Sequence, residues 1–186
     1  LYDISFLPVT YPLKEAPAPL GIHSMFSHER EECEAGYYKV HLDSYGIDVE
    51  LTATERCGIQ RYSYPADSAT VLLNLGKATN WDATTDTYVA QVDSCTIEGY
   101  RYSDGWARGQ QVYFRTRFSS PIIAMQCDST TVADGTTMKK VAGTIRLDFS
   151  LDSRRELTVA TAISGTGLAG AEKNLNTEAP HNDFDI

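Results

Sequence analysis

The fold is decided by residues 36–54, GYYKVHLDSYGIDVELTAT, in which apolar and polar side chains alternate on both sides of a turn. Apolar residues take every second position before the turn, starting at Tyr38, and again after it, starting at Ile47. A period of two places one face of a strand against a core, so each run predicts a half-buried antiparallel strand. The connecting residues 43–46, DSYG, offer a side-chain acceptor first and a glycine that tolerates positive φ last. The stretch therefore predicts a β-hairpin.

The same alternation continues along the chain and indicates an all-β protein. In residues 111–118, QVYFRTRF, apolar residues and threonine share one face, and tyrosine and polar residues share the other, which we expect to stay wet. More strands are predicted at residues 3–9, 59–64, 70–75, 88–97, 122–126, 144–151 and 157–163. About ten or more strands are too many for one flat sheet. We therefore expect an antiparallel two-sheet β-sandwich.

Two segments depart from this pattern. Residues 11–20 contain three prolines, which remove amide donors and fix φ, so we expect an exposed loop or edge there. Near the other end, Thr166 can cap a short helix that ends before Pro180. The sequence thus predicts a sandwich over residues 1–165 and a short helix with a connector over residues 166–186.

The composition excludes several classes of function. The 186 residues carry a net charge of -9, which disfavours binding to nucleic acid and to anionic membrane surfaces. No run of about 18 apolar residues is present, so no membrane span is predicted. The chain begins with Leu1 rather than Met, and its first residues lack the layout of a signal peptide. We therefore expect it to be a segment of a longer protein.

The cysteines and histidines form no recognisable catalytic or zinc motif. No two cysteines form a C-x-x-C pair, so zinc or thioredoxin-like chemistry is not indicated. We expect buried free thiols, with disulfides as the alternative, at Cys33, Cys57, Cys95 and Cys127. No serine or cysteine lies at a nucleophile elbow that a histidine could serve.

Acidic residues cluster at Glu29, Glu31, Glu32 and Glu34. One carboxyl of raised pKa among them could donate a proton, but four acids on a polar stretch indicate a solvated face instead. Residues 128–135, DSTTVADG, superficially resemble a calcium loop. They lack the alternating side-chain oxygens and the late glutamate of such a loop, so we interpret them as a hairpin turn. No catalytic residue and no metal ligand is predicted in this chain.

Five stretches, taken together and in order, resemble the N-terminal domain of glycoside hydrolase family 92. They are FSHEREE (26–32), GYYKVHLDSYGIDVELTAT (36–54), RCGIQRYSYP (56–65), GYRYSDGWARGQQVYFRTRFSSP (99–121) and AEKNLNTEAPHNDFD (171–185). Two positions depart from the family pattern, because Ala35 stands where proline is expected and Gln60 where histidine is common. Both substitutions are compatible with a strand framework.

This resemblance implies a galactose-mutarotase-like β-sandwich and a role in the degradation of α-mannoside glycans. Family 92 comprises calcium-dependent, inverting, exo-acting α-mannosidases, whose carboxylates and calcium ligands belong to a helical barrel that follows the sandwich. The resemblance therefore implies that this chain is a non-catalytic domain, inactive by itself, that packs on its own catalytic (α/α) barrel and helps to form the sugar pocket. It also implies a periplasmic or extracellular bacterial enzyme.

The candidate contacts to carbohydrate or to the catalytic domain are Ser27, His28, Glu31, Arg101 and Trp106. Sugars stack their C–H faces on aromatic rings and hydrogen-bond to polar groups at the ring edge, which the segment 99–106, GYRYSDGW, could supply. Trp81 follows Asn80 in a second turn of this kind. The alternative is that Trp106 packs in the core and Arg101 pairs with a nearby acid.

Two other functions stay open. An autonomous carbohydrate-binding module would bind mannose or mannobiose by itself and would lose that binding on Trp106→Ala. A complete small hydrolase would release mannose without any other domain. The first interpretation, a module of a larger mannosidase, explains the resemblance most fully.

Overall fold

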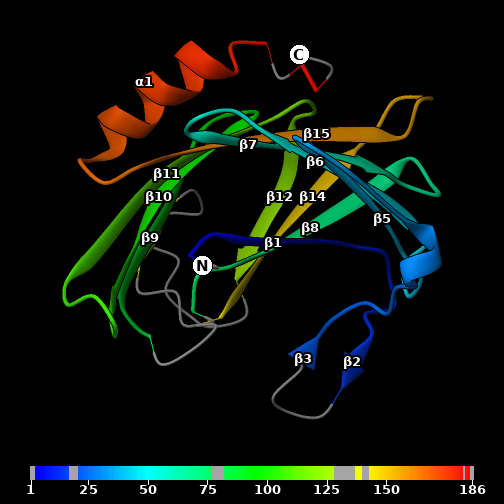
Figure 1. Cartoon of the computed structure of the whole chain (residues 1–186), viewed down its shortest axis with the longest axis horizontal. Coiled ribbons are helices and arrows are strands. Elements are labelled where there is room, and N and C mark those ends of the chain that lie inside the picture. The colour runs from blue at the N-terminus through cyan, green and yellow to red at the C-terminus, as the bar shows by residue number, and fades with distance from the viewer. Residues whose placement is uncertain are drawn as a thin grey trace.

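Two antiparallel sheets stack face to face in the computed structural model, which describes residues 3–16, 21–76, 82–127, 137–139, 143–181 and 183–184 (Figure 1). The predicted β-sandwich is therefore confirmed. The smaller sheet has the order β1 (Ser5–Val9), β8 (Ser68–Asn74), β14 (Thr144–Ser150) and β12 (Ile122–Cys127). No helix in the described ranges is long and apolar enough to cross a membrane.

The larger sheet has nine strands and carries most of the residues discussed below. Its order is β13 (Thr137–Lys139), β9 (Ala83–Asp93), β10 (Thr96–Asp104), β11 (Gln110–Phe118), β15 (Glu156–Ser164), β7 (Cys57–Ser63), β6 (Ile47–Ala53), β5 (Tyr37–Leu42) and β4 (Glu31–Glu34). The 3-10 helix η1 (His28–Arg30) precedes β4 at one end of this sheet. The β10–β11 hairpin lies near the other end, so the two regions are far apart in the sheet order (Figure 1).

The hairpin expected from residues 36–54 is confirmed. Strands β5 and β6 pair antiparallel, and the Gly46 amide donates to the Leu42 carbonyl over 2.8 Å. Gly46 has a φ of 64°, which favours glycine at this position. The single strand expected at residues 88–97 is wrong, because the chain turns at Ser94 and Cys95 and divides into β9 and β10. Alternation alone did not reveal that turn.

The main core lies between the sheets. Inward-facing residues of both layers, including Leu73, Phe114, Phe118 and Phe149, form one buried apolar cluster. Phe118 meets Phe149 with ring centroids 4.9 Å apart. Burial of such apolar area is the main stabilising contribution to a fold of this kind.

A second, smaller core lies on the outer face of the larger sheet, beneath helix α1 (Leu168–Glu178). The helix packs mainly on β15 and β11, and it buries Ala171 and Leu175. Its N-cap is Gly167, with a φ of 139° and no side-chain capping bond, so the expected Thr166 cap is wrong. The outer face of β11 is also less wet than expected, because Arg117 donates to the Ala179 carbonyl over 3.1 Å.

The proline-containing segment forms part of a small separate ribbon. Strands β2 (Glu15–Ala16) and β3 (Gly21–Ile22) pair with each other, and residues 17–20 lie outside the described ranges. The cysteines differ in burial. The expected burial is confirmed for Cys57 and wrong for Cys33, which is exposed, while Cys95 and Cys127 are intermediate.

Candidate functional site

The loop that precedes β4 is held by short-range contacts. Ser27 is the N-cap of η1, and its hydroxyl accepts a hydrogen bond from the Glu29 amide over 3.3 Å. The Phe26 ring packs edge-on against the His28 ring, with centroids 5.4 Å apart. Phe26 and the preceding Met25 are 48% and 63% exposed. The loop therefore presents apolar surface to solvent beside a charged helix.

Glu31 joins this loop to the sheet. Its carboxylate accepts hydrogen bonds from the Tyr38 hydroxyl and contacts the His28 ring. These contacts lower the pKa of Glu31, with the Tyr38 bond as the largest cause, and burial opposes the effect. A general acid of a glycosidase needs the opposite shift. Glu31 is therefore arranged as an anion that orients its neighbours.

Arg101 is 1% exposed and lies between the two sheets. Its Nη1 donates to Asp3 over 2.7 Å and to Asp82 over 3.0 Å, and its Nε donates to the Leu75 carbonyl over 3.0 Å. Asp3 also accepts from the Gln110 side chain over 2.9 Å. The network joins the N-terminal segment to both strands of the β10–β11 hairpin. Arg101 is thus a structural residue, as the alternative interpretation held, and it is not available to a sugar.

Trp106 lies in the turn of the same hairpin and is 86% exposed. The alternative that it packs in the core is therefore wrong. The turn is ordered by its own hydrogen bonds, because the Gly109 amide donates to Asp104 over 2.7 Å and the Gly105 amide to the Ala107 carbonyl over 3.2 Å. A large ring thus projects from a braced turn. Trp81 and residues 128–135 lie outside the described ranges.

The structure divides the candidate residues between two places. Ser27, His28 and Glu31 lie at the β4 end of the larger sheet, and Trp106 lies at the tip of the β10–β11 hairpin. Strands β15, β7, β6 and β5 intervene in the sheet order. The five candidates therefore do not form a single site.

Sequence reasoning missed a group of aromatic residues on the outer face of β9, β10 and β11. We call it the tyrosine face and define it as Tyr88, Tyr100, Tyr102 and Tyr113, with Asp86 and Gln111 beside them. Tyr100 stacks on Tyr102 with ring centroids 4.3 Å apart and on Tyr88 with centroids 5.4 Å apart. The alternation of Tyr100 and Tyr102 with Arg101 indicates that the two tyrosines share a face of one strand. It does not indicate which residues of the neighbouring strands lie beside them, because the strand pairing cannot be derived from the sequence.

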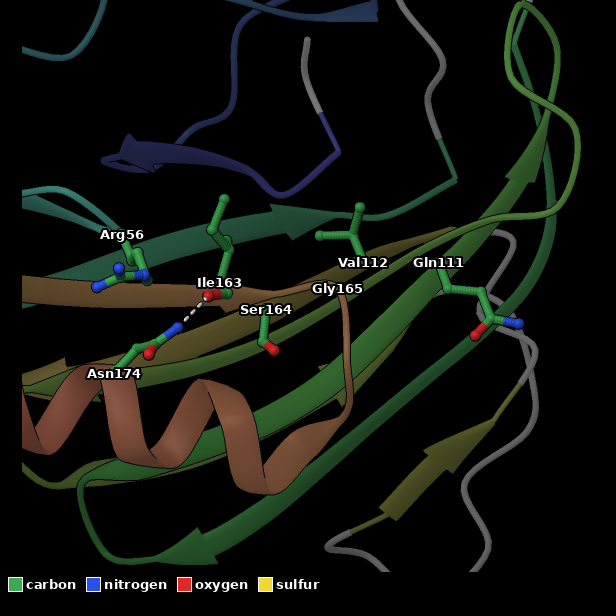
Figure 2. A pocket seen from close by; sticks show the side chains of 7 residues that line it. All are labelled: Arg56, Gln111, Val112, Ile163, Ser164, Gly165 and Asn174. Carbon is green, nitrogen blue, oxygen red and sulfur yellow. Dashed lines mark hydrogen bonds between the residues drawn. The ribbon is translucent and has the colours of Figure 1, made fainter.

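A shallow hollow of about 310 Å³ lies where β15 leads into α1, and we call it the corner hollow (Figure 2). Its lining consists of Arg56, Gln111, Val112, Ile163, Ser164, Gly165 and Asn174. Figure 2 shows the Asn174 side chain turned toward β15, where its amide donates to the Ile163 carbonyl over 2.8 Å. Arg56 is ion-paired to Glu178 over 2.6 Å. The hollow therefore lies at the end of β15, with Val112 and Ile163 on the inward side of the sheet and Ser164 and Gln111 on the outward side (Figure 2).

The described residues do not fit a metal centre. No three histidine, cysteine, aspartate or glutamate side chains among them are grouped so that they could hold an ion. The acids of lowered pKa are instead hydrogen-bonded to neighbouring groups. The Arg61 bond is the largest cause for Glu50, and the Thr54 bond is the largest cause for Glu178.

Comparisons with known proteins place this geometry in a family. The family model described as the glycosyl hydrolase family 92 N-terminal domain matches residues 1–164. The family GH92 α-mannosidase BT3965 from Bacteroides thetaiotaomicron is 26% identical with a TM-score of 0.87, over 100% of this chain and 27% of that chain. No curated protein matches this chain.

Two further solved structures share the fold. The family GH92 inverting mannosidase BT2199 from Bacteroides thetaiotaomicron VPI-5482 is 23% identical with a TM-score of 0.77, over 98% of this chain and 24% of that chain. The gh92 family glycosyl hydrolase ccman5 is 20% identical with a TM-score of 0.77. The chain thus spans about a quarter of the length of these enzymes. Because the family model covers residues 1–164 of 186, the chain belongs to glycosyl hydrolase family 92, of which it represents the N-terminal domain.

Proposed function

We propose that this chain is the non-catalytic N-terminal β-sandwich domain of a calcium-dependent, inverting exo-α-mannosidase that degrades glycans outside the bacterial cytoplasm. In this proposal the sandwich packs on a catalytic helical barrel and helps to form the sugar pocket, and residues 166–186 lead toward that barrel. The main support for the proposal is that the whole of this chain aligns with only 27% of an α-mannosidase. The catalytic residues and the calcium ligands then lie in another part of the enzyme.

The acid chemistry of the described residues supports a non-catalytic role. An inverting glycosidase needs one carboxyl of raised pKa to protonate the leaving oxygen and a second carboxylate, ~6.5–9.5 Å away, to activate water. Every described carboxyl with a resolved shift, namely Glu31, Glu50, Asp152 and Glu178, has a lowered pKa. Each of these groups accepts hydrogen bonds from a tyrosine, threonine, arginine or backbone amide. They are stable anions and not proton donors at neutral pH.

Two exposed places suit the contact with a catalytic domain. One is the loop with Met25 and Phe26, and the other is Trp106 at the hairpin tip. Large exposed apolar side chains of this kind can anchor a protein interface. Since the two places lie at opposite parts of the larger sheet, they can be tested separately.

The test uses the full-length enzyme with single alanine substitutions. We expect Phe26→Ala or Trp106→Ala to lower kcat/KM for an α-mannoside by about tenfold or more, because loss of an interface anchor costs ~2 kcal/mol. Ile123→Ala is the matched control, since Ile123 is 65% exposed on β12 of the smaller sheet and should leave kcat/KM unchanged. If all three variants retain wild-type kcat/KM, neither exposed place contacts the catalytic domain.

One observation favours a second function, that of an autonomous carbohydrate-binding module. Trp106 is 86% exposed, and the apolar face of an exposed indole ring can stack on the C–H face of a sugar. Calorimetric titration of the 186-residue chain with mannobiose would then give a binding isotherm that Trp106→Ala abolishes. A flat titration at millimolar mannobiose would rule this function out.

A further inference from the structure

The tyrosine face is a regular grid of six side chains. Register pairs Tyr88 with Tyr100 and Tyr100 with Tyr113, which gives one row across three strands. The next row pairs Asp86 with Tyr102 and Tyr102 with Gln111. All six side chains lie on the face opposite the main core, because paired residues of a sheet share a face and Gly99 and Arg101 point inward.

Ring stacking and hydrogen bonds order these side chains in the free protein. The parallel stacking of Tyr88, Tyr100 and Tyr102 fixes the rings side by side, and Tyr113 meets Tyr102 edge-on with centroids 5.8 Å apart. The Tyr102 and Tyr113 hydroxyls lie 2.7 Å apart, and the Tyr113 hydroxyl donates to the side-chain Oε1 of Gln111 over 3.1 Å. A surface ordered in this way loses little conformational entropy on binding.

Several polar groups on this face can form further hydrogen bonds. The Tyr113 hydroxyl donates its only proton to Gln111, so in its contact with Tyr102 it must accept. Tyr102 is therefore the donor of that bond, and the lone pairs of its own oxygen remain able to accept. The Tyr100 hydroxyl donates to Asp86 over 3.2 Å and likewise keeps its acceptor sites. The amide nitrogen of Gln111 donates to none of the described residues, and Gln111 is exposed. Donors and acceptors therefore stand next to each other at the edge of the rings.

The tyrosine face meets the outward side of the corner hollow. Gln111 belongs to both, and Ser164 of the hollow is the register partner of Tyr113. Figure 2 shows Gln111 and Ser164 on neighbouring strands, with Gly165 leading from Ser164 into α1. A volume of about 310 Å³ is at the small end of the range for ligand sites, ~300–1,000 Å³.

The chemistry of this combined surface identifies the class of ligand. Asp86 is the only charged group of the tyrosine face, and its carboxylate already accepts from the Thr87 amide and the Tyr100 hydroxyl. The neighbouring Arg115 is ion-paired to Glu98 over 2.8 Å and to Glu172 over 3.4 Å. The six residues that define the tyrosine face thus include no cation for a phosphorylated or acidic ligand. A neutral chain of hydroxyl groups matches the row of adjacent donors and acceptors.

We propose that the tyrosine face and the corner hollow together bind a neutral oligosaccharide. One sugar unit lies at the outward side of the hollow, against Gln111 and Ser164, and the adjoining units lie along the edges of Tyr102 and Tyr113. The choice of an α-mannan as the ligand rests on the proposed function, whereas the binding surface itself does not. In an exo-acting enzyme such a surface would retain the polymer between cleavage events.

The test is affinity electrophoresis of the 186-residue chain in native gels that contain soluble α-mannan. We expect the mobility of the wild-type chain to fall as the mannan concentration rises. Tyr102→Phe keeps the ring and removes the hydroxyl, so it should raise the dissociation constant about fivefold, which is the effect of one lost hydrogen bond. Tyr102→Phe combined with Gln111→Ala should raise it by about twentyfold or more.

Tyr11→Phe is the matched control, because Tyr11 is exposed and its ring lies against Arg146 of the smaller sheet. This variant should bind mannan like the wild type, and circular dichroism should show that all variants are folded. The inference is overturned if the wild-type chain is not retarded at any mannan concentration, or if the double variant is retarded as strongly as the wild type. Either result leaves the interface test with Phe26→Ala and Trp106→Ala unaffected, so failure of this inference is distinguishable from failure of the proposed function.

Discussion

The two faces of the β10–β11 hairpin differ completely in role, although their residues alternate in one short stretch of sequence. Gly99 and Arg101 point into the sandwich and serve the fold, whereas Tyr100 and Tyr102 point outward and form a rigid polar and aromatic surface. Arg101 was a plausible sugar contact by residue type, and the structure buries it in an ion-paired network. A shift of one residue along a strand therefore separates a structural residue from a binding candidate.

The largest effect expected on the inward face comes from Arg101→Met. The methionine keeps much of the apolar stem but leaves Asp3, Asp82 and the Leu75 carbonyl without their shared donor. Breaking a buried ion pair from one side typically costs 3–5 kcal/mol, and partial exposure of the two aspartates places the expected loss at about 3 kcal/mol. Urea denaturation of the two proteins measures this difference.

Arg154→Ala is the control for Arg101→Met. Arg154 pairs with Asp152 over 3.2 Å, but both side chains are exposed, so its loss should change the free energy of unfolding by less than about 0.5 kcal/mol. Suppose instead that Arg101→Met lowers the free energy of unfolding no more than Arg154→Ala does. In that case the stability of the inward face would not depend on the buried charge of Arg101, and the proposed contrast between the two faces would be wrong.

Gly99→Ala tests how tightly the inward face is packed. A Cβ at this position would lie 2.1 Å from the Tyr88 carbonyl oxygen and 2.8 Å from the Phe114 ring. Because backbone and core must both move, we expect a loss of about 2–3 kcal/mol in the free energy of unfolding. Gly58→Ala on β7 is the matched control, since its Cβ would meet no atom within 4 Å. Equal melting temperatures for the two variants would contradict this packing.

The outward face should show a smaller effect that appears only at high pH. The hydrogen bond that Tyr102 donates to Tyr113, followed by burial, raises the pKa of Tyr102 to about 12 from the ordinary 10.0. A raised pKa means that the folded state holds this proton more tightly, so the stabilisation is complete below pH 10 and is lost as the pH rises toward 12. Absorbance titration of phenolate should lose one late-titrating group in Tyr102→Phe. Loss of a group that titrates near pH 10 instead would show that Tyr102 is not in this network.

Much of the fold could be predicted because the alternation of residues reports local geometry directly. Residues 36–54 show this clearly, since both strands and the positive φ of Gly46 are confirmed. The turn at Ser94 and Cys95 was missed because neither glycine nor proline marks it. The helix was anticipated, but its cap was not, because Gly167 acts through a φ of 139° and not through a side chain.

The candidate site was predictable only in part. The sequence placed Arg101 and Trp106 in one group by residue type, yet their environments depend on pairing and on contacts with Asp3 and Asp82, which are distant in sequence. The tyrosine face was invisible for the same reason, because it brings together residues of three strands. Residue types indicate what a surface could bind, but register decides which side chains meet.

The central claim is that this domain supports an α-mannosidase without carrying out its chemistry, and one assay tests that claim most directly. The purified 186-residue chain is incubated with α-mannobiose, and free mannose is measured against a protein-free blank and against the full-length enzyme. We expect no mannose above the blank from the chain alone and multiple turnovers from the full-length enzyme. Sustained release by the chain alone, more than one mannose per molecule and abolished by Glu31→Gln, would contradict the account.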